Sequence, residues 1–211
     1  MAYDLEEQEQ LEAIKGWWAD NGKLVLLVLI SGLLTIAAFQ GWRYYQAQQA
    51  QSAATLYAQL GQAEQANEPK KVRDIAAQLT DRYGSTAYAP MAALAAARAS
   101  FATGELEEAR KHLQWVIDNT REDELRDVAR LRLAAVLLDE KKHDEALKVL
   151  SAKSSDAYVA LFADLRGDVL AAQGKVAEAR AAYQTALDKT DAGSSYRRLL
   201  EVKLDALGEG K

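Results

Sequence analysis

Residues 101–110 read FATGELEEAR, and residues 171–180 read AAQGKVAEAR. Between them, residues 137–147 read LLDEKKHDEAL, which follows the same order: the end of an apolar helix, a turn, and then a Glu-Ala pair. A unit that recurs at a nearly fixed period is typical of solenoids, in which stacked units share one continuous core. No part of the chain shows a sustained alternation of apolar and polar residues, so the sequence predicts an all-α fold.

The alanines of the three Glu-Ala pairs are 37 and then 33 residues apart along the chain: Ala109, Ala146 and Ala179. Five residues before each alanine stands a residue of the turn: Gly104, Lys141 or Gly174. A small alanine lets two antiparallel helices approach closely, and the turn residue must tolerate left-handed backbone geometry. We therefore expect three to four helical hairpins, because a single hairpin cannot bury its own apolar face.

The ends of this array are less regular than its middle. The loop at residues 67–69 predicts a helix that ends near Gly84, with that glycine as a left-handed stop. In this helix Ala76 precedes Ala109 by 33 residues, which gives a looser first hairpin. Residues 194–207 (SSYRRLLEVKLDAL) predict a helix that caps the last apolar face.

Residues 24–42 (LVLLVLISGLLTIAAFQGW) contain no charged side chain. At a rise of about 1.5 Å per residue this run spans roughly 28 Å, which is close to the hydrocarbon thickness of a bilayer. Aromatic residues flank it on both sides, as they do in membrane-spanning helices. These residues are Trp17, Trp18, Trp42, Tyr44 and Tyr45. The predicted anchor residues are Leu24, Leu27, Ile30, Leu33, Leu34, Ile36, Phe39 and Trp42.

Three other readings of this run are weaker. A cleaved signal peptide has a basic start, whereas residues 1–22 carry six acids and only Lys15 as a base. A buried core helix seldom lacks a polar stripe, and an interfacial helix needs a charged face. Lys15 and Lys23 precede the span, whereas Arg43 is the single base that follows before Lys70, so the N-terminus is predicted to lie in the cytoplasm.

The composition excludes several classes of function. The 211 residues include 26 Lys and Arg against 31 Asp and Glu, and this balance argues against a nucleic-acid binder. With no cysteine, the chain has no disulfide, thiolate nucleophile or cysteine zinc site. His112 and His143 are the only histidines, and no nucleophile accompanies them. We therefore expect no catalytic residues, no metal site and no cofactor.

A solenoid of hairpins offers a concave groove lined by the first helix of each hairpin, and this groove suits a peptide or a partner helix. The candidate groove residues lie on three such helices. They are Met91, Leu94, Arg98, Phe101, Val128, Leu131, Leu138, Asp164 and Asp168. An alternative reading is that several of them belong to the core.

The third unit resembles a tetratricopeptide repeat. It carries the small and large residues of that repeat in order: Leu165, Gly167, Leu170, Gly174, Ala179, Tyr183 and Ala186. The resemblance covers residues 88–191 well and residues 54–87 loosely. It implies an α-solenoid with a concave binding face.

The layout of the whole chain resembles the YfgM family, the ancillary subunit of the bacterial SecYEG translocon. The resemblance rests on three blocks: WWADNGK at residues 17–23, GWRYY at residues 41–45 and ADLRGD at residues 163–168. It implies the following segments: 1–22, an acidic cytoplasmic tail; 23–43, a transmembrane helix; 44–87, a linker helix and loose hairpin; 88–191, tetratricopeptide-like repeats; 192–211, a capping helix and tail.

The same resemblance implies a single-pass protein of the bacterial inner membrane with its C-terminal domain in the periplasm. Its implied partners are the lipid bilayer, the SecYEG translocon and a membrane-anchored periplasmic chaperone of the prolyl-isomerase type. It also ties the N-terminal tail to an envelope-stress regulator. Two alternatives remain: an envelope scaffold for cell division or outer-membrane biogenesis, and a cytosol-facing co-chaperone adaptor.

Overall fold

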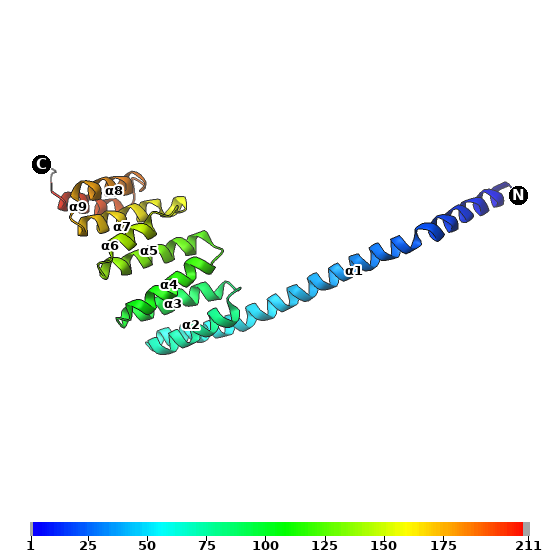
Figure 1. The fold of residues 1–211 in the computed structure, drawn as a ribbon, viewed down its shortest axis with the longest axis horizontal. Helices are drawn as coiled ribbons and strands as arrows, with labels where there is room; N and C mark the ends of the chain where they lie inside the picture. Colours follow the sequence, from blue (N-terminus) through cyan, green and yellow to red (C-terminus); the bar gives the residue numbers. More distant parts are fainter. Residues whose placement is uncertain (1, 209–211) are drawn as a thin grey trace. The chain divides into compact units, whose positions relative to one another are not determined.

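The computed structural model describes residues 2–208, with side chains from residue 7 onward (Figure 1). The chain divides into two units, residues 1–49 and residues 50–211, and each is considered by itself. Over the described range every regular element is helical, which confirms the all-α prediction. Residues 209–211 of the predicted C-terminal tail lie outside the described range.

Helix α1 (Ala2–Gln65) is a single element of 64 residues. It contains the acidic tail, the uncharged run and the segment predicted as a linker helix, without a break at Gly61. A cap or proline usually ends a helix, and neither occurs before Asn67 and Pro69. The last turns of α1 therefore supply the first helix of the first hairpin.

The second unit is a series of short antiparallel helices, which follow one another in chain order in Figure 1. They are α2 (Pro69–Tyr83), α3 (Tyr88–Ala102), α4 (Leu106–Asn119), α5 (Asp123–Asp139), α6 (His143–Leu150), the 3₁₀ turn η1 (Asp156–Tyr158), α7 (Val159–Ala172), α8 (Val176–Asp188) and α9 (Tyr196–Ala206). The end of α1 pairs with α2, α3 with α4, α5 with α6, and α7 with α8. Helix α9 follows as the predicted cap.

The same turn joins the two helices of every hairpin. One residue adopts a left-handed conformation, and the N–H of the next residue donates to a carbonyl five residues earlier, which is the Schellman arrangement. The left-handed residues are Asn67 (φ 55°), Gly104 (φ 77°), Lys141 (φ 60°) and Gly174 (φ 75°). The returning bonds are Glu68 to Ala63, Glu105 to Ser100, Lys142 to Leu137 and Lys175 to Leu170, at 2.8–3.0 Å. The predicted geometry at the three recognised turns is confirmed.

Two details of the first hairpin differ from the sequence prediction. The turn residue is Asn67, so Val72, five residues later, takes the place that alanine holds in the other hairpins, and Ala76 does not. Gly84 has a right-handed φ of −55°, so it is not a left-handed stop. The connection from α2 to α3 instead uses Thr86, whose hydroxyl donates to the carbonyl of Tyr83 at 2.7 Å.

Alanine at the helix crossings is fully enclosed in each of the three recognised hairpins. Ala109, Ala146 and Ala179 are all 0% exposed. One core cluster joins α3 to α7 and includes Leu113, Leu133 and Leu150. A second cluster joins the end of α1 to α2 and α3, so the loose first hairpin is a full member of the stack.

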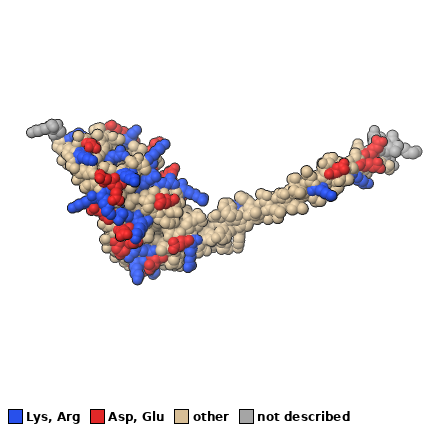
Figure 2. Space-filling view, viewed as in Figure 1, with Lys and Arg blue, Asp and Glu red and all other residues tan. Residues whose placement is uncertain are grey.

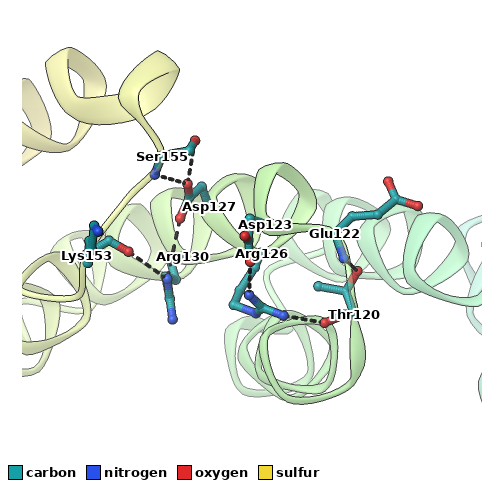
Figure 3. A network of polar contacts seen from close by, with 8 residues as sticks. All are labelled: Thr120, Glu122, Asp123, Arg126, Asp127, Arg130, Lys153 and Ser155. Carbon is teal, nitrogen blue, oxygen red and sulfur yellow. Dashed lines mark hydrogen bonds and ion pairs between the residues drawn. The ribbon is translucent and has the colours of Figure 1, made fainter.

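The third hairpin has a short second helix, because α6 contains only eight residues. A polar network holds the chain that follows it (Figure 3). Asp127 of α5 is 2% exposed, and its carboxylate accepts hydrogen bonds from the backbone N–H and the hydroxyl of Ser155, at 2.8 and 2.9 Å. Arg130 donates to the carbonyl of Lys153 at 3.3 Å. Polar contacts thus replace the helical turns that α6 lacks.

Candidate functional site

The predicted membrane anchor lies within α1 and exposes its apolar side chains on all sides. Its eight named residues, from Leu24 to Trp42, are 55–67% exposed. Figure 2 shows this part of α1 as a stretch without a charged side chain. Among the described residues, α1 alone is long and apolar enough to cross a bilayer, with a mean hydropathy of 2.3 over its most apolar window. An apolar surface of this extent is stable only against lipid or a partner protein.

The hydroxyl groups inside this run are satisfied by the helix itself. Ser31 donates to the carbonyl of Leu27, and Thr35 donates to the carbonyl of Ser31, each at 2.8 Å. A polar group in hydrocarbon is costly unless it is bonded internally, and these two groups meet that requirement. At the C-terminal end the guanidinium of Arg43 lies 5.8 Å from the centre of the Phe39 ring.

The left-handed turn residues place all the predicted groove residues at four shared positions of the first helices. Counted back from Gly104, Lys141 and Gly174, these positions are thirteen, ten, six and three residues before the turn. Thirteen residues before are Met91 and Val128; ten before are Leu94, Leu131 and Asp164; six before are Arg98 and Asp168; three before are Phe101 and Leu138. The sequence therefore identified equivalent positions in successive hairpins.

The structure separates these residues into core, surface and bonded groups. Leu94 is 8% exposed and belongs to the main core cluster, and Val128, Leu131 and Leu138 pack against that cluster while half-buried. Met91 is also half-buried. Arg98 is exposed and Phe101 is 45% exposed, so α3 carries the most accessible part of the predicted groove.

Asp164 and Asp168 on α7 are engaged by the helix that follows. The ammonium of Lys203 on α9 lies 2.7 Å from Asp164 and 2.8 Å from Asp168. The hydroxyl of Tyr196 donates to Asp164 at 2.6 Å, and that of Tyr183 donates to Asp168 at 2.8 Å. These two carboxylates are thus bonded within the chain rather than open to a partner, unlike the groove position we predicted for them.

Burial and the two carboxylates shift the titration of this cluster. Burial, together with the hydrogen bonds to Asp168 and Asp164, raises the pKa of Tyr183 and of Tyr196 well above the ordinary tyrosine value. For Lys203, burial opposes the charge, but the hydrogen bonds to both carboxylates outweigh it and raise the pKa. The lysine and both tyrosines are therefore protonated at neutral pH, which keeps α9 joined to α7.

The ADLRGD block owes its residue types to this packing. A Cβ added to Gly167 would lie 2.4 Å from the ring of Tyr183, so only glycine fits. The guanidinium of Arg166 donates to the carbonyl of Leu150 at 2.8 Å and ties α7 to the end of α6. The block that carries the resemblance in sequence is thus the block that closes the end of the solenoid.

Sequence reasoning missed Arg132, which faces Arg98 and Phe101 across a hollow of about 280 Å³. Ala97 and Leu113 complete the lining. Arg132 is exposed on α5 and lies one residue past Leu131, and this offset is why the spacing rule passed over it. No signal in the sequence pairs Arg132 with Arg98, because α4 lies between their helices along the chain and only the packing of the hairpins brings them to one hollow.

The two histidines lie apart from these surfaces. Burial, with positive charge from Arg73 and Lys111, lowers the pKa of His112 against an opposing effect of Glu108. Within the described residues, no group of three or more His, Asp or Glu side chains is arranged to hold a metal ion.

Comparison with known proteins gives the chain its family. A family model described as a tetratricopeptide repeat-like domain matches residues 15–209. A protein of Neisseria gonorrhoeae named ancillary SecYEG translocon subunit is 34% identical over 208 residues, which cover 98% of this chain and 100% of that protein. Proteins of the same name from Escherichia coli and Haemophilus influenzae are 31% and 29% identical, covering 95% and 98% of this chain and 96% and 100% of their own.

Solved structures share the fold. The MamA RS-1 ArsTM double mutant and MamA 41-end from Desulfovibrio magneticus RS-1 both match with a TM-score of 0.54 and 19% identity. They cover 72% and 74% of this chain, and 85% and 90% of their own chains. At this identity the likeness shows the solenoid fold alone. The relatives match over nearly the full chain, and this match shows the family. The chain belongs to the family of ancillary SecYEG translocon subunits, with a tetratricopeptide repeat-like domain.

Proposed function

We propose that this chain is a membrane-anchored scaffold that associates with the SecYEG translocon and helps pass secreted or membrane proteins to periplasmic chaperones. The observation that carries the proposal is the uncharged run at residues 24–42 of α1, most of whose large apolar side chains are more than half exposed. The name shared by the relatives supports the translocon as the partner. The stacked hairpins support a role in binding proteins, because their face is extended and presents side chains at regular intervals.

The mechanism is tethering and not chemistry. The anchor confines the solenoid to the membrane, and partners held there meet at a raised effective concentration. One such partner is a membrane-anchored periplasmic chaperone of the prolyl-isomerase type. In this scheme the anchor determines where the protein acts, and the surface of the solenoid determines what it holds.

The orientation follows from the bases beside the span. Lys15 and Lys23 precede it, and after Arg43 no base occurs before Lys70. Lys and Arg near a span favour the cytoplasmic side. This supports a bacterial inner-membrane protein with a cytoplasmic N-terminus and a periplasmic solenoid. In that orientation the acidic tail faces the cytoplasm, where an envelope-stress regulator can contact it.

Crosslinking in cells tests the proposal. A photo-reactive side chain at Leu131 or Phe101 is irradiated in the full chain, which is then purified in detergent through a C-terminal tag. Translocon subunits and a periplasmic chaperone should be recovered. A matched control replaces residues 24–42 by an unrelated apolar span of the same length, which keeps the membrane location and separates anchoring from recognition. Recovery of division or outer-membrane assembly proteins, without translocon or chaperone, would favour the other envelope scaffold.

The cytosolic alternative is tested by the same crosslinks. A cytosol-facing co-chaperone adaptor would crosslink cytosolic chaperones from Leu131 and Phe101 and no periplasmic protein. That result would reject the periplasmic part of the proposal.

A further inference from the structure

The hollow between α3 and α5 combines an apolar floor with two cationic groups. Phe101 and Arg98 come from α3, Arg132 comes from α5, and Ala97 and Leu113 close the base. Leu113 is 1% exposed and Phe101 is 45% exposed, so the floor is fixed and the aromatic ring is accessible. The volume of about 280 Å³ suits one or two side chains of a bound segment and is too small for a folded domain.

Neither arginine has a partner for its charge in the part of the chain that the structure describes. No carboxylate of residues 7–208 lies within ion-pair distance of Arg98 or Arg132, and no hydrogen bond from either guanidinium occurs there. Most other arginines of the solenoid form an ion pair with a carboxylate, as Arg110 does with Glu140, or donate to a backbone carbonyl, as Arg197 does to Leu187. The two charges at the hollow are therefore available to an anion.

Another hairpin of the repeat has a charged side chain at the position of Arg98, and there the charge is paired within the chain. Arg98 and Asp168 occupy the same register position, six residues before the left-handed turn residue. Asp168 of α7 is paired with Lys203 of α9, which lies five residues before the left-handed Gly208. In α5, the first helix of the hairpin after Arg98, the residue five before the left-handed Lys141 is Val136, so α5 has a buried apolar side chain where α9 has a counter-charge. Within the described residues Arg98 therefore has no counter-charge from the neighbouring hairpin.

We propose that this hollow binds a segment of a partner protein in which an apolar side chain is flanked by Asp or Glu side chains. The apolar side chain packs on Phe101 and Leu113, and the carboxylates accept charge-assisted hydrogen bonds from Arg98 and Arg132. Arginine and aromatic residues side by side are typical of the residues that contribute most to protein–protein binding. The inference rests on the proposed role as a protein-binding scaffold but not on the identity of the translocon.

Fluorescence anisotropy with the full chain in detergent tests this inference. The probe is a short labelled peptide with the central sequence Asp-Leu-Glu-Phe-Asp, acetylated and amidated so that all of its carboxylates are side chains. The comparison peptides carry Asn-Leu-Gln-Phe-Asn or Lys-Leu-Lys-Phe-Lys at the same place. The acidic peptide should bind at least about tenfold more tightly than the amide peptide, since each lost charge-assisted bond costs a large part of a tenfold step. Its affinity should fall as salt is added.

Variants locate the binding on the chain. Arg98→Ala and Arg132→Ala should each weaken the acidic peptide by about tenfold, and Phe101→Ala should weaken acidic and amide peptides alike. The matched controls are Arg82→Ala and Arg121→Ala, which remove exposed arginines outside the hollow and should leave the affinity unchanged. Equal binding of the acidic and amide peptides, no binding of the acidic peptide, or loss of binding in the control variants would overturn the inference.

Co-purification from cells that carry the same variants separates the two proposals. If Arg98→Ala/Arg132→Ala loses peptide binding and keeps the translocon, the inference holds, and the translocon contact lies elsewhere. If no peptide binding occurs while the wild-type chain recovers the translocon, the inference fails by itself. If the peptide binds and no translocon component is recovered, the proposed function fails and the docking site stands.

Discussion

The fourth hairpin and the second hairpin use the same register positions in opposite ways. On α7, Asp164 and Asp168 are bonded to Lys203 and to two tyrosines of α8 and α9. On α3, the equivalent side chains are Leu94, which is core, and Arg98, which has no described partner. The fourth hairpin uses both positions to hold α9, whereas the second hairpin buries one of them and leaves the other, Arg98, without a described partner. A repeat therefore fixes where a side chain lies, whereas its neighbours decide what it does.

The largest effect on stability should come from breaking the ion cluster at α9. Lys203→Ala leaves two poorly exposed carboxylates without their counter-charge, which should lower the free energy of unfolding by about 3 kcal/mol. Urea unfolding followed by circular dichroism measures this. Lys189→Ala, an exposed lysine at the end of α8, is the control and should change stability by less than about 0.5 kcal/mol. A loss that is no larger for Lys203→Ala than for this control would contradict the assignment.

The second-largest effect on stability should come from the close contact between Gly167 of α7 and Tyr183 of α8. Gly167→Ala places a Cβ against the ring of Tyr183 and should destabilise the fold by about 2 kcal/mol through overpacking. Gly61→Ala is the matched control, because no atom lies within 4 Å of its added Cβ and alanine favours the helix. That variant should be as stable as the wild type or more so. A Gly167→Ala chain that is as stable as the wild type, or that changes stability no differently from Gly61→Ala, would contradict a close contact with Tyr183.

Much of this fold could be predicted from the sequence, and the parts that could not share a physical cause. Gly104, Lys141 and Gly174 identified the turns because local backbone geometry restricts the residue type there. The first hairpin was misaligned because its turn residue is Asn67 and its crossing residue is Val72, so neither matched the Gly and Ala pattern.

The residues that bond to the predicted groove residues could not be predicted from the sequence for a different reason. Lys203 lies 39 residues from Asp164 in sequence, and only the packing of α9 brings the two together. Spacing predicts which face a residue occupies, but the element that covers this face is a property of the tertiary structure. For the same reason Arg132 was missed beside Arg98.

Alkaline pH should loosen α9 before the rest of the solenoid. The pKa values of Tyr183, Tyr196 and Lys203 are raised in the folded chain, so folding keeps protons that the unfolded chain would release. Their contribution to the free energy of unfolding is fully present below the ordinary tyrosine pKa of about 10 and is lost progressively as the pH rises toward the raised pKa values. Tyrosinate absorbance should show two late-titrating tyrosines. In a Lys203→Ala chain their titration should move to lower pH, because α9 is then loosened.

The smallest effect is a gain in stability at the third turn. Lys141 is the one turn residue of the recognised hairpins that is neither glycine nor asparagine, yet it has a φ of 60°. Lys141→Gly should stabilise the chain by about 0.5 to 1 kcal/mol, because glycine adopts this conformation without steric cost. The reverse change at the equivalent position, Gly174→Lys, should destabilise it by a similar amount. The midpoints of thermal unfolding of the two variants, compared with the wild type, test this prediction. A loss of stability in Lys141→Gly would contradict the left-handed turn at Lys141.

We propose that residues 24–42 stay in the lipid and that the solenoid lies on the far side of the membrane from the N-terminus. Protease treatment of intact spheroplasts tests it most directly, using a chain tagged at both ends. The C-terminal tag should disappear, while a short N-terminal fragment stays protected in the membrane until detergent is added. Survival of the C-terminal tag in intact spheroplasts, or a mature chain that lacks the N-terminal tag and leaves the membrane without detergent, would contradict it.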